Sequence, residues 1–133
     1  MIRFEAMLRT AMLVVLATLA MSFGLIGQEG HPLAGTWHGQ WKPSATETKP
    51  VVFFLQWDSN NVVGEINPGR NSMPIKLVTL DPDKWMVHFE AQAKDGTKVV
   101  VDGQLENIGS YNRTVKGTWT QGTTKGAFEM SRD

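Results

Sequence analysis

The chain has 133 residues, with 13 basic and 13 acidic side chains, five tryptophans and no cysteine. This length leaves room for one domain. Without cysteine there is no disulfide scaffold, no thiolate metal site and no lipid anchor on cysteine. The even charge balance provides no positive field to gather phosphates, so we expect no nucleic-acid partner.

The N-terminal segment has the pattern of an export signal. Arg3 and Arg9 precede an apolar run from Ala11 to Ile26. A basic region, a short apolar stretch and small residues in this order are typical of a secretory signal peptide. The run is also short for a bilayer span, which takes about 20 apolar residues. We therefore predict a signal peptide over residues 1–27.

The predicted mature protein is nearly neutral. Cleavage after Ser22 or after Gly27 fits the pattern, and an uncleaved anchor stays open as the alternative. Removal of residues 1–27 leaves 11 basic and 12 acidic side chains. We expect a secreted or periplasmic protein without stable membrane insertion after cleavage. Residues 28–34 are then a lead-in, and residues 35–133 are the folded domain.

From Gly35 onward the sequence predicts strands. Short alternating runs rich in Val, Thr, Trp and Phe are separated by clusters of turn residues. The eight runs are Thr36–Lys42, Val51–Trp57, Asn61–Ile66, Met73–Leu80, Lys84–Ala91, Lys98–Glu106, Arg113–Gln121 and Lys125–Arg132. Links this short join antiparallel neighbours, and closing eight strands removes the exposed edges. The predicted fold is an all-β, eight-stranded antiparallel up-and-down barrel.

Alternation along each run predicts which side chains face the interior. Trp37 and Trp41 share one face of the first run, while His38 and Gln40 share the other. By the same rule the interior receives Phe53, Leu55, Trp57, Trp85, Val87, Phe89, Val99, Val101, Leu105, Val115, Trp119, Phe128 and Met130. Glycines at inward positions 39, 103 and 117 would allow tight bending and leave room for a neighbouring indole.

Two short motifs resemble the lipocalins and the wider calycin group. Gly35-Thr-Trp37 opens the first run, and Arg132 ends the last. In that family the arginine packs across the opening tryptophan and closes one end of the barrel. The resemblance to short secreted bacterial lipocalin-like domains implies this role for Trp37 and Arg132, a cation–π contact of about 0.5–2 kcal/mol. It also implies carriage of a small hydrophobic ligand.

The barrel end opposite Arg132 is the predicted ligand mouth. The strand directions bring Trp41, Phe53, Ile75, Phe89 and Trp119 toward it, below the predicted loop 43–50, whereas Trp57 and Trp85 are predicted to plug the other end. An eight-stranded barrel holds one small ligand or is filled by side chains. Two interpretations stay open: the rings clasp a small apolar ligand, or they fill the core of a structural or protein-interaction domain of the cell envelope.

The sequence predicts no catalytic group, cofactor or metal site. His38 and His88 fall on the outer face, and Glu90 follows His88 by two residues. This pair would need a third ligand from a neighbouring strand to hold a metal ion, so we expect ordinary surface histidines. The serines stand outside known nucleophile motifs. We therefore expect a protein that is not an enzyme.

Overall fold

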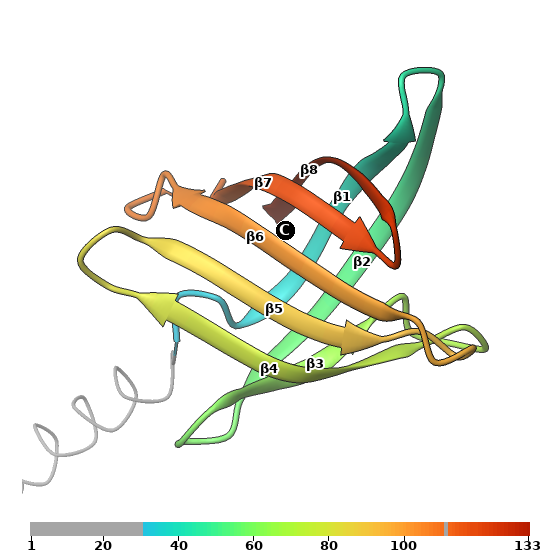
Figure 1. Cartoon of the computed structure of the whole chain (residues 1–133). Helices are drawn as coiled ribbons and strands as arrows, with labels where there is room; N and C mark the ends of the chain where they lie inside the picture. Colours follow the sequence, from blue (N-terminus) through green and yellow to red (C-terminus); the bar gives the residue numbers. More distant parts are fainter. Residues whose placement is uncertain (1–30, 111) are drawn as a thin grey trace, which may run out of the picture. The chain divides into compact units, whose positions relative to one another are not determined.

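The computed structural model describes residues 31–110 and 112–133, which form one closed barrel of eight antiparallel strands in chain order (Figure 1). The strands are β1 (Gly35–Ser44), β2 (Glu47–Trp57), β3 (Val62–Ile66), β4 (Met73–Asp81), β5 (Met86–Gln92), β6 (Lys98–Glu106), β7 (Thr114–Gln121) and β8 (Thr124–Arg132). The predicted fold class is confirmed. The predicted signal peptide and residues 28–30 of the lead-in lie outside the described residues. Within the described ranges, no helix is long and apolar enough to cross a membrane.

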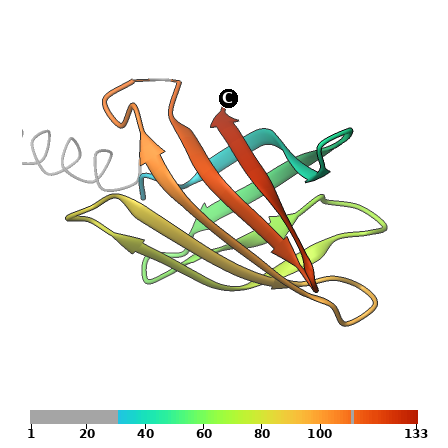
Figure 2. The ribbon, with the colours of Figure 1, turned by 45° about the horizontal axis from the view of Figure 1, so that its top comes forward.

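The barrel closes because β8 pairs with β1. Trp37 lies opposite Arg132 and Trp41 opposite Phe128 in this ladder. Figure 2 shows the closed barrel from a second direction, in which the strands of its near and far sides are strongly tilted relative to one another. This coiling follows from the right-handed twist that strands favour.

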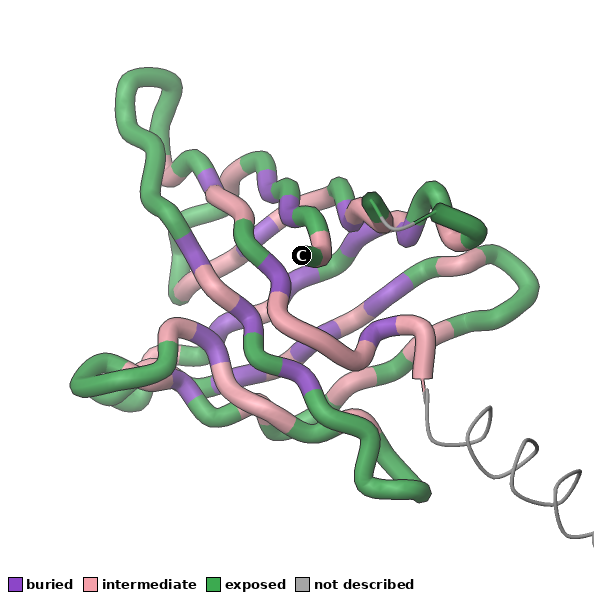
Figure 3. Tube along the Cα trace, turned by 180° about the vertical axis from the view of Figure 1, so that it is seen from behind, coloured by how far each residue is buried: buried purple, intermediate pink, exposed green. Residues whose placement is uncertain are grey.

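Side-chain alternation builds the core as predicted. Buried and accessible residues alternate along most strands (Figure 3). Phe53 is at the centre, with its ring centroid 5.2 Å from Phe89, 6.2 Å from Trp119 and 5.7 Å from Phe128. Aromatic rings at such separations and tilted angles attract one another beyond the area they bury. The aromatic cluster therefore packs across the interior from four different strands.

The structure corrects the predicted inward position of Trp57 and the predicted strand position of Trp85. Trp57 is the last residue of β2 and is 38% exposed, with its ring stacked 5.1 Å from the ring of His31. Trp85 lies in the turn before β5 and has a φ of 55°. Its backbone N–H donates to Asp81 at 2.7 Å, so the turn extends further than predicted. The Trp85 side chain is nevertheless half-buried and packs against the core, as predicted.

The predicted loop over residues 43–50 is mostly strand. β1 runs to Ser44 and β2 starts at Glu47, so only two residues turn the chain. A register shift between Trp41 and Ser44 accommodates Pro43, as expected of proline at a bulge. The hairpin projects beyond the N-terminal start of β8 (Figure 1), so the part of β1 after Trp41 has no ladder partner in β8.

Close approach of neighbouring strands explains the inward glycines. A Cβ atom on Gly117 would overlap the carbonyl oxygen of Asp102 and lie 2.5 Å from the Cα of Gly103. A Cβ on Gly39 would overlap the carbonyl oxygen of Glu129. The nearest atoms are thus mainly backbone, and any side chain would force the coiled strands apart.

One seam of the barrel is much shorter than the others. β3 and β4 pair only through Glu65 with Pro74 and through Ile66 with Met73. Proline has no N–H to donate, so it suits the point where a ladder stops. The inward side chains Ile75, Val78 and Leu80 of β4 are only half-buried. The core is therefore less well covered along this seam.

Candidate functional site

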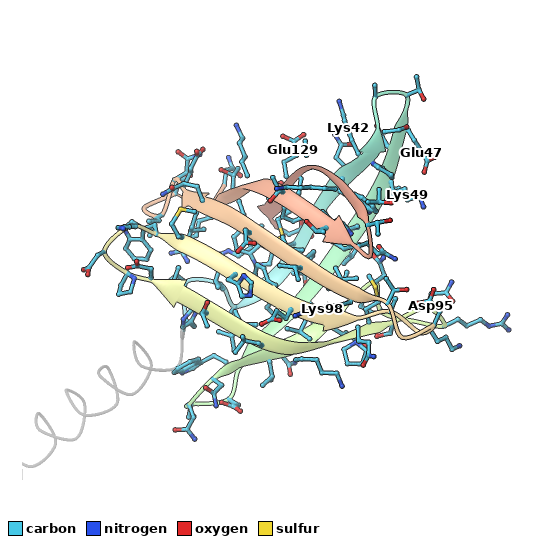
Figure 4. The ribbon with its side chains drawn as sticks, in the orientation of Figure 1. Lys42, Glu47, Lys49, Asp95, Lys98 and Glu129 are labelled. Atoms are coloured by element: carbon cyan, nitrogen blue, oxygen red, sulfur yellow. The ribbon has the colours of Figure 1, made fainter. Side chains whose placement is uncertain are left out.

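The mouth is the barrel end formed by the β1–β2, β3–β4, β5–β6 and β7–β8 turns. It contains a depression of about 440 Å³, which lies within the usual size range of ligand pockets. Its apolar floor consists of Trp41, Val51, Met73, Ala93 and Trp119. Its more exposed rim consists of Lys49, Pro50, Asn67, Asn71, Lys94, Asp95 and Gln121. In Figure 4, Lys49 lies on the β1–β2 hairpin and Asp95 in the β5–β6 turn.

Two stacked indoles form the centre of the floor. The ring centroids of Trp41 and Trp119 are 5.2 Å apart, and the ring planes differ by 16°. Trp41 and Trp119 are only 5% and 1% exposed, so the two stacked rings cover the interior at this end of the barrel. The indole nitrogen of Trp119 donates to Gln121 Oε1 at 3.2 Å. This hydrogen bond satisfies the polar edge of the ring and fixes its orientation.

The structure brings together four of the five predicted ligand-binding residues. Trp41 and Trp119 line the depression, while Phe53 and Phe89 are buried and in edge contact with one another. Ile75 is half-buried on β4 and packs against the core at the short seam instead. A ligand at the mouth would therefore contact the indoles directly and the phenyl rings only indirectly.

The sequence pattern placed loop 43–50 at the mouth but did not show that a polar rim forms there. Lys49 falls in that loop, Asn67 and Lys94 fall between predicted strand runs, and Gln121 ends one. Their positions beside turns at the mouth were visible in the sequence. The direction of each side chain was not, because it depends on the bulge in β1 and on turn dihedral angles.

The opposite end of the barrel is closed by the lead-in. Leu33 is fully buried, and its carbonyl oxygen accepts a 2.8 Å hydrogen bond from the indole nitrogen of Trp37. Leu33 therefore plugs this end, and of the two tryptophans predicted here only Trp85 packs against the core. Residues 31–34 belong to the folded unit, which begins at His31.

Two arginines hold the lead-in in place. Arg113 donates from Nη1 to the carbonyl oxygen of Pro32 and from Nε to that of Ile108, both at 2.9 Å. Arg132 lies across Gly35 and approaches the carbonyl oxygen of Ala34 at 3.4 Å. Burial and the nearby charge of Arg132 lower the pKa of Arg113. The contribution of Arg113 went unnoticed in the sequence because nothing in its local pattern indicates a partner 81 residues away.

A charged row on the outer wall contains the only His-x-Glu pair. His88 Nδ1 is 2.6 Å from Asp102 Oδ1, and His88 Nε2 is 3.3 Å from Glu90 Oε2. Lys98 Nζ lies 2.8 Å from Glu90. The hydrogen bond to Asp102 is the main cause that raises the pKa of His88. Since the two carboxylates bind opposite ring nitrogens, they cannot converge on one metal ion.

The remaining histidines also lie away from the mouth. His38 on β1 is 2.7 Å from Asp133, and His31 stacks on Trp57. Among residues 31–110 and 112–133, no group of three or more His, Cys, Asp or Glu side chains is arranged to hold a metal ion.

A second hollow lies on the outer wall across β1, β8 and β7. It has a volume of about 320 Å³ and is lined by Gln40, Lys42, Lys116, Gly117, Ala127, Phe128 and Glu129. The Gln40 side chain on β1 donates a hydrogen bond to Glu129 on β8 at 3.2 Å, so side chains from two lining strands are bonded to each other. Figure 4 shows Lys42 and Glu129 on this side of the barrel. Phe128 is the single aromatic residue that lines this hollow, whereas two stacked indoles line the mouth, so the mouth is the better candidate site.

Comparison with protein-family models, with curated proteins and with solved structures finds no match to this chain.

Proposed function

We propose that this chain is an exported, non-catalytic β-barrel binding module that carries a small, largely apolar ligand in its mouth. The proposal rests on the depression of about 440 Å³ over the stacked Trp41 and Trp119 rings. The indoles offer a flat apolar contact, and the polar residues of the rim offer hydrogen-bond partners that can orient a ligand. A flat ligand would bury apolar area against the floor while its edge remained near the rim.

The ligand lies above the interior rather than deep inside it. Phe53, Phe89, Trp119 and Phe128 already contact one another across the barrel. An eight-stranded barrel is wide enough to be filled by side chains or to hold one small ligand, and here aromatic rings occupy the centre. Binding at the mouth therefore requires no rearrangement of the core.

Export and lipocalin-like character are part of the same proposal. Arg3, Arg9 and the apolar run to Ile26 support export. The eight-stranded barrel and the ladder pairing of Trp37 with Arg132 support the lipocalin-like assignment. Location of His38 and His88 on the outer wall, each beside a carboxylate, supports a non-catalytic role.

Tryptophan fluorescence of the purified protein, titrated with a panel of apolar aromatic probes, tests the proposal. We expect a saturable change near one equivalent. Trp41→Leu should weaken binding by at least about twofold, because the floor loses one of its two stacked rings. Trp57→Leu is the matched control, because Trp57 is exposed at the opposite end.

A second variant separates loss of binding from loss of folding. Asn71 is an exposed rim residue, so Asn71→Trp fills the depression without altering the core. It should abolish binding while the circular dichroism spectrum and unfolding midpoint stay unchanged. A flat response of the wild-type protein to the whole panel, or equal losses in the Trp41 and Trp57 variants, would refute the proposal.

The short β3–β4 seam favours a second candidate, a protein-interaction domain. Val63 on β3 and Leu77 on β4 are 42% and 44% exposed, and the adjoining inward residues of β4 are half-buried. Exposed apolar patches often mark interaction surfaces. Light scattering after size exclusion over a range of concentrations should then show association that Leu77→Lys abolishes. A strict monomer that also yields no envelope partner in pull-down would remove this candidate.

A further inference from the structure

Within the polar rim of the mouth, the side-chain amide oxygens of Asn67 and Gln121 already accept hydrogen bonds from groups of the protein. Gln121 Oε1 accepts from the indole nitrogen of Trp119 at 3.2 Å, and Asn67 Oδ1 accepts from the backbone N–H of Val52 at 2.9 Å. An indole nitrogen and a backbone N–H can only donate. These contacts occupy the amide oxygens and leave the N–H₂ groups available as donors.

The single carboxylate of the rim is engaged in the same way. Asp95 Oδ1 accepts from the backbone N–H of Thr97 at 2.9 Å. Hydrogen bonds from the Thr97 side chain and backbone lower the pKa of Asp95. Asp95 is thus a turn residue bonded to its own loop, a common use of aspartate.

The donors of the rim are less engaged. Lys94 Nζ donates to the carbonyl oxygen of Arg70 at 3.0 Å, which uses one of its three protons. Lys49 Nζ is 3.6 Å from Glu47 in an exposed pair, and such pairs are weak. Within the described part of the chain, the side-chain amide nitrogens of Asn67 and Gln121 have no recorded acceptor. Two ammonium groups and two amide groups consequently surround the indole floor.

We infer that the mouth selects planar apolar molecules that carry a carboxylate or a similar anionic edge. This inference rests on the proposed function and specifies its ligand class. The ring lies over the Trp41–Trp119 pair, and the anion points toward Lys49 and Lys94. A cationic edge would meet the same two ammonium groups. The nearby carboxylates are Asp95, which already accepts a hydrogen bond from Thr97, and Glu47, which lies 3.6 Å from Lys49.

Isothermal titration calorimetry with three matched probes tests the inference. The probes are 2-naphthoate, 2-naphthalenemethanol and 2-naphthylmethylammonium, which share one ring system and differ in charge. We expect naphthoate to bind about tenfold more tightly than the alcohol at low salt, and the ammonium probe to bind most weakly. The preference should shrink in about 0.5 M salt, because the rim charges are exposed and screened.

Charge variants assign the preference to the rim. K49Q/K94Q should bring the affinity for naphthoate down to that for the alcohol. K84Q/K116Q removes two lysines outside the depression and should keep the preference. If no probe binds, the proposed function itself fails. If the alcohol or the ammonium probe binds as tightly as naphthoate, or if both double variants lose the preference equally, the mouth still binds apolar rings but this ligand class is overturned.

Discussion

Gly117→Ala tests whether close strand approach holds the barrel in its coiled form. The added methyl group would overlap the carbonyl oxygen of Asp102 and press on the Cα of Gly103. Overpacking of this kind costs about 1–3 kcal/mol, and the upper end applies because the obstacle is backbone rather than a movable side chain. Replacing glycine also restricts the unfolded chain and stabilises by about 0.4–1 kcal/mol.

The net destabilisation expected for Gly117→Ala is therefore about 2 kcal/mol. For a domain of this size the melting temperature should fall by roughly 8–16 °C. Urea unfolding followed by tryptophan fluorescence and thermal unfolding followed by circular dichroism measure both quantities. Gly109→Ala is the matched control, since a Cβ there meets nothing within 4 Å, and its stability should change by at most about 0.5 kcal/mol. Equal stability of the Gly117 variant and wild type would refute the role given to backbone contact.

Three further changes probe the core, the outer wall and the lead-in. Phe53→Ala should lower the free energy of unfolding by about 3–5 kcal/mol, because it leaves a cavity among the aromatic rings; a loss below about 1 kcal/mol in urea unfolding would contradict this. Asp102 raises the pKa of His88, so its stabilisation is complete below the unfolded pKa of about 6.5 and disappears as the pH rises through the native pKa. Asp102→Asn should thus cost more stability at about pH 5.5 than at about pH 9, and equal losses would contradict the assignment. Arg113→Met should cost about 1–3 kcal/mol through the unpaired carbonyl of Pro32, with faster amide exchange in residues 33–34, and unchanged exchange would contradict the lead-in contact.

The sequence was sufficient for the barrel and for most of its core. Odd–even alternation depends only on the pleat of a strand, so Trp37, Phe53, Phe89 and Trp119 were assigned to the interior correctly. Turn residues every few positions then implied antiparallel neighbours and the observed order. These are local properties, which the chain carries in each short segment.

Only the tertiary structure decided how the two barrel ends are built. Trp57 and Trp85 follow the alternation in sequence, but Trp57 ends its strand and is exposed, whereas Trp85 packs against the core from a turn with positive φ. Arg113 reaches Pro32 across 81 positions, and the Asn67 oxygen accepts from Val52 on the neighbouring strand. Such contacts depend on register, bulges and turn geometry between segments far apart in the chain, and no local pattern records them.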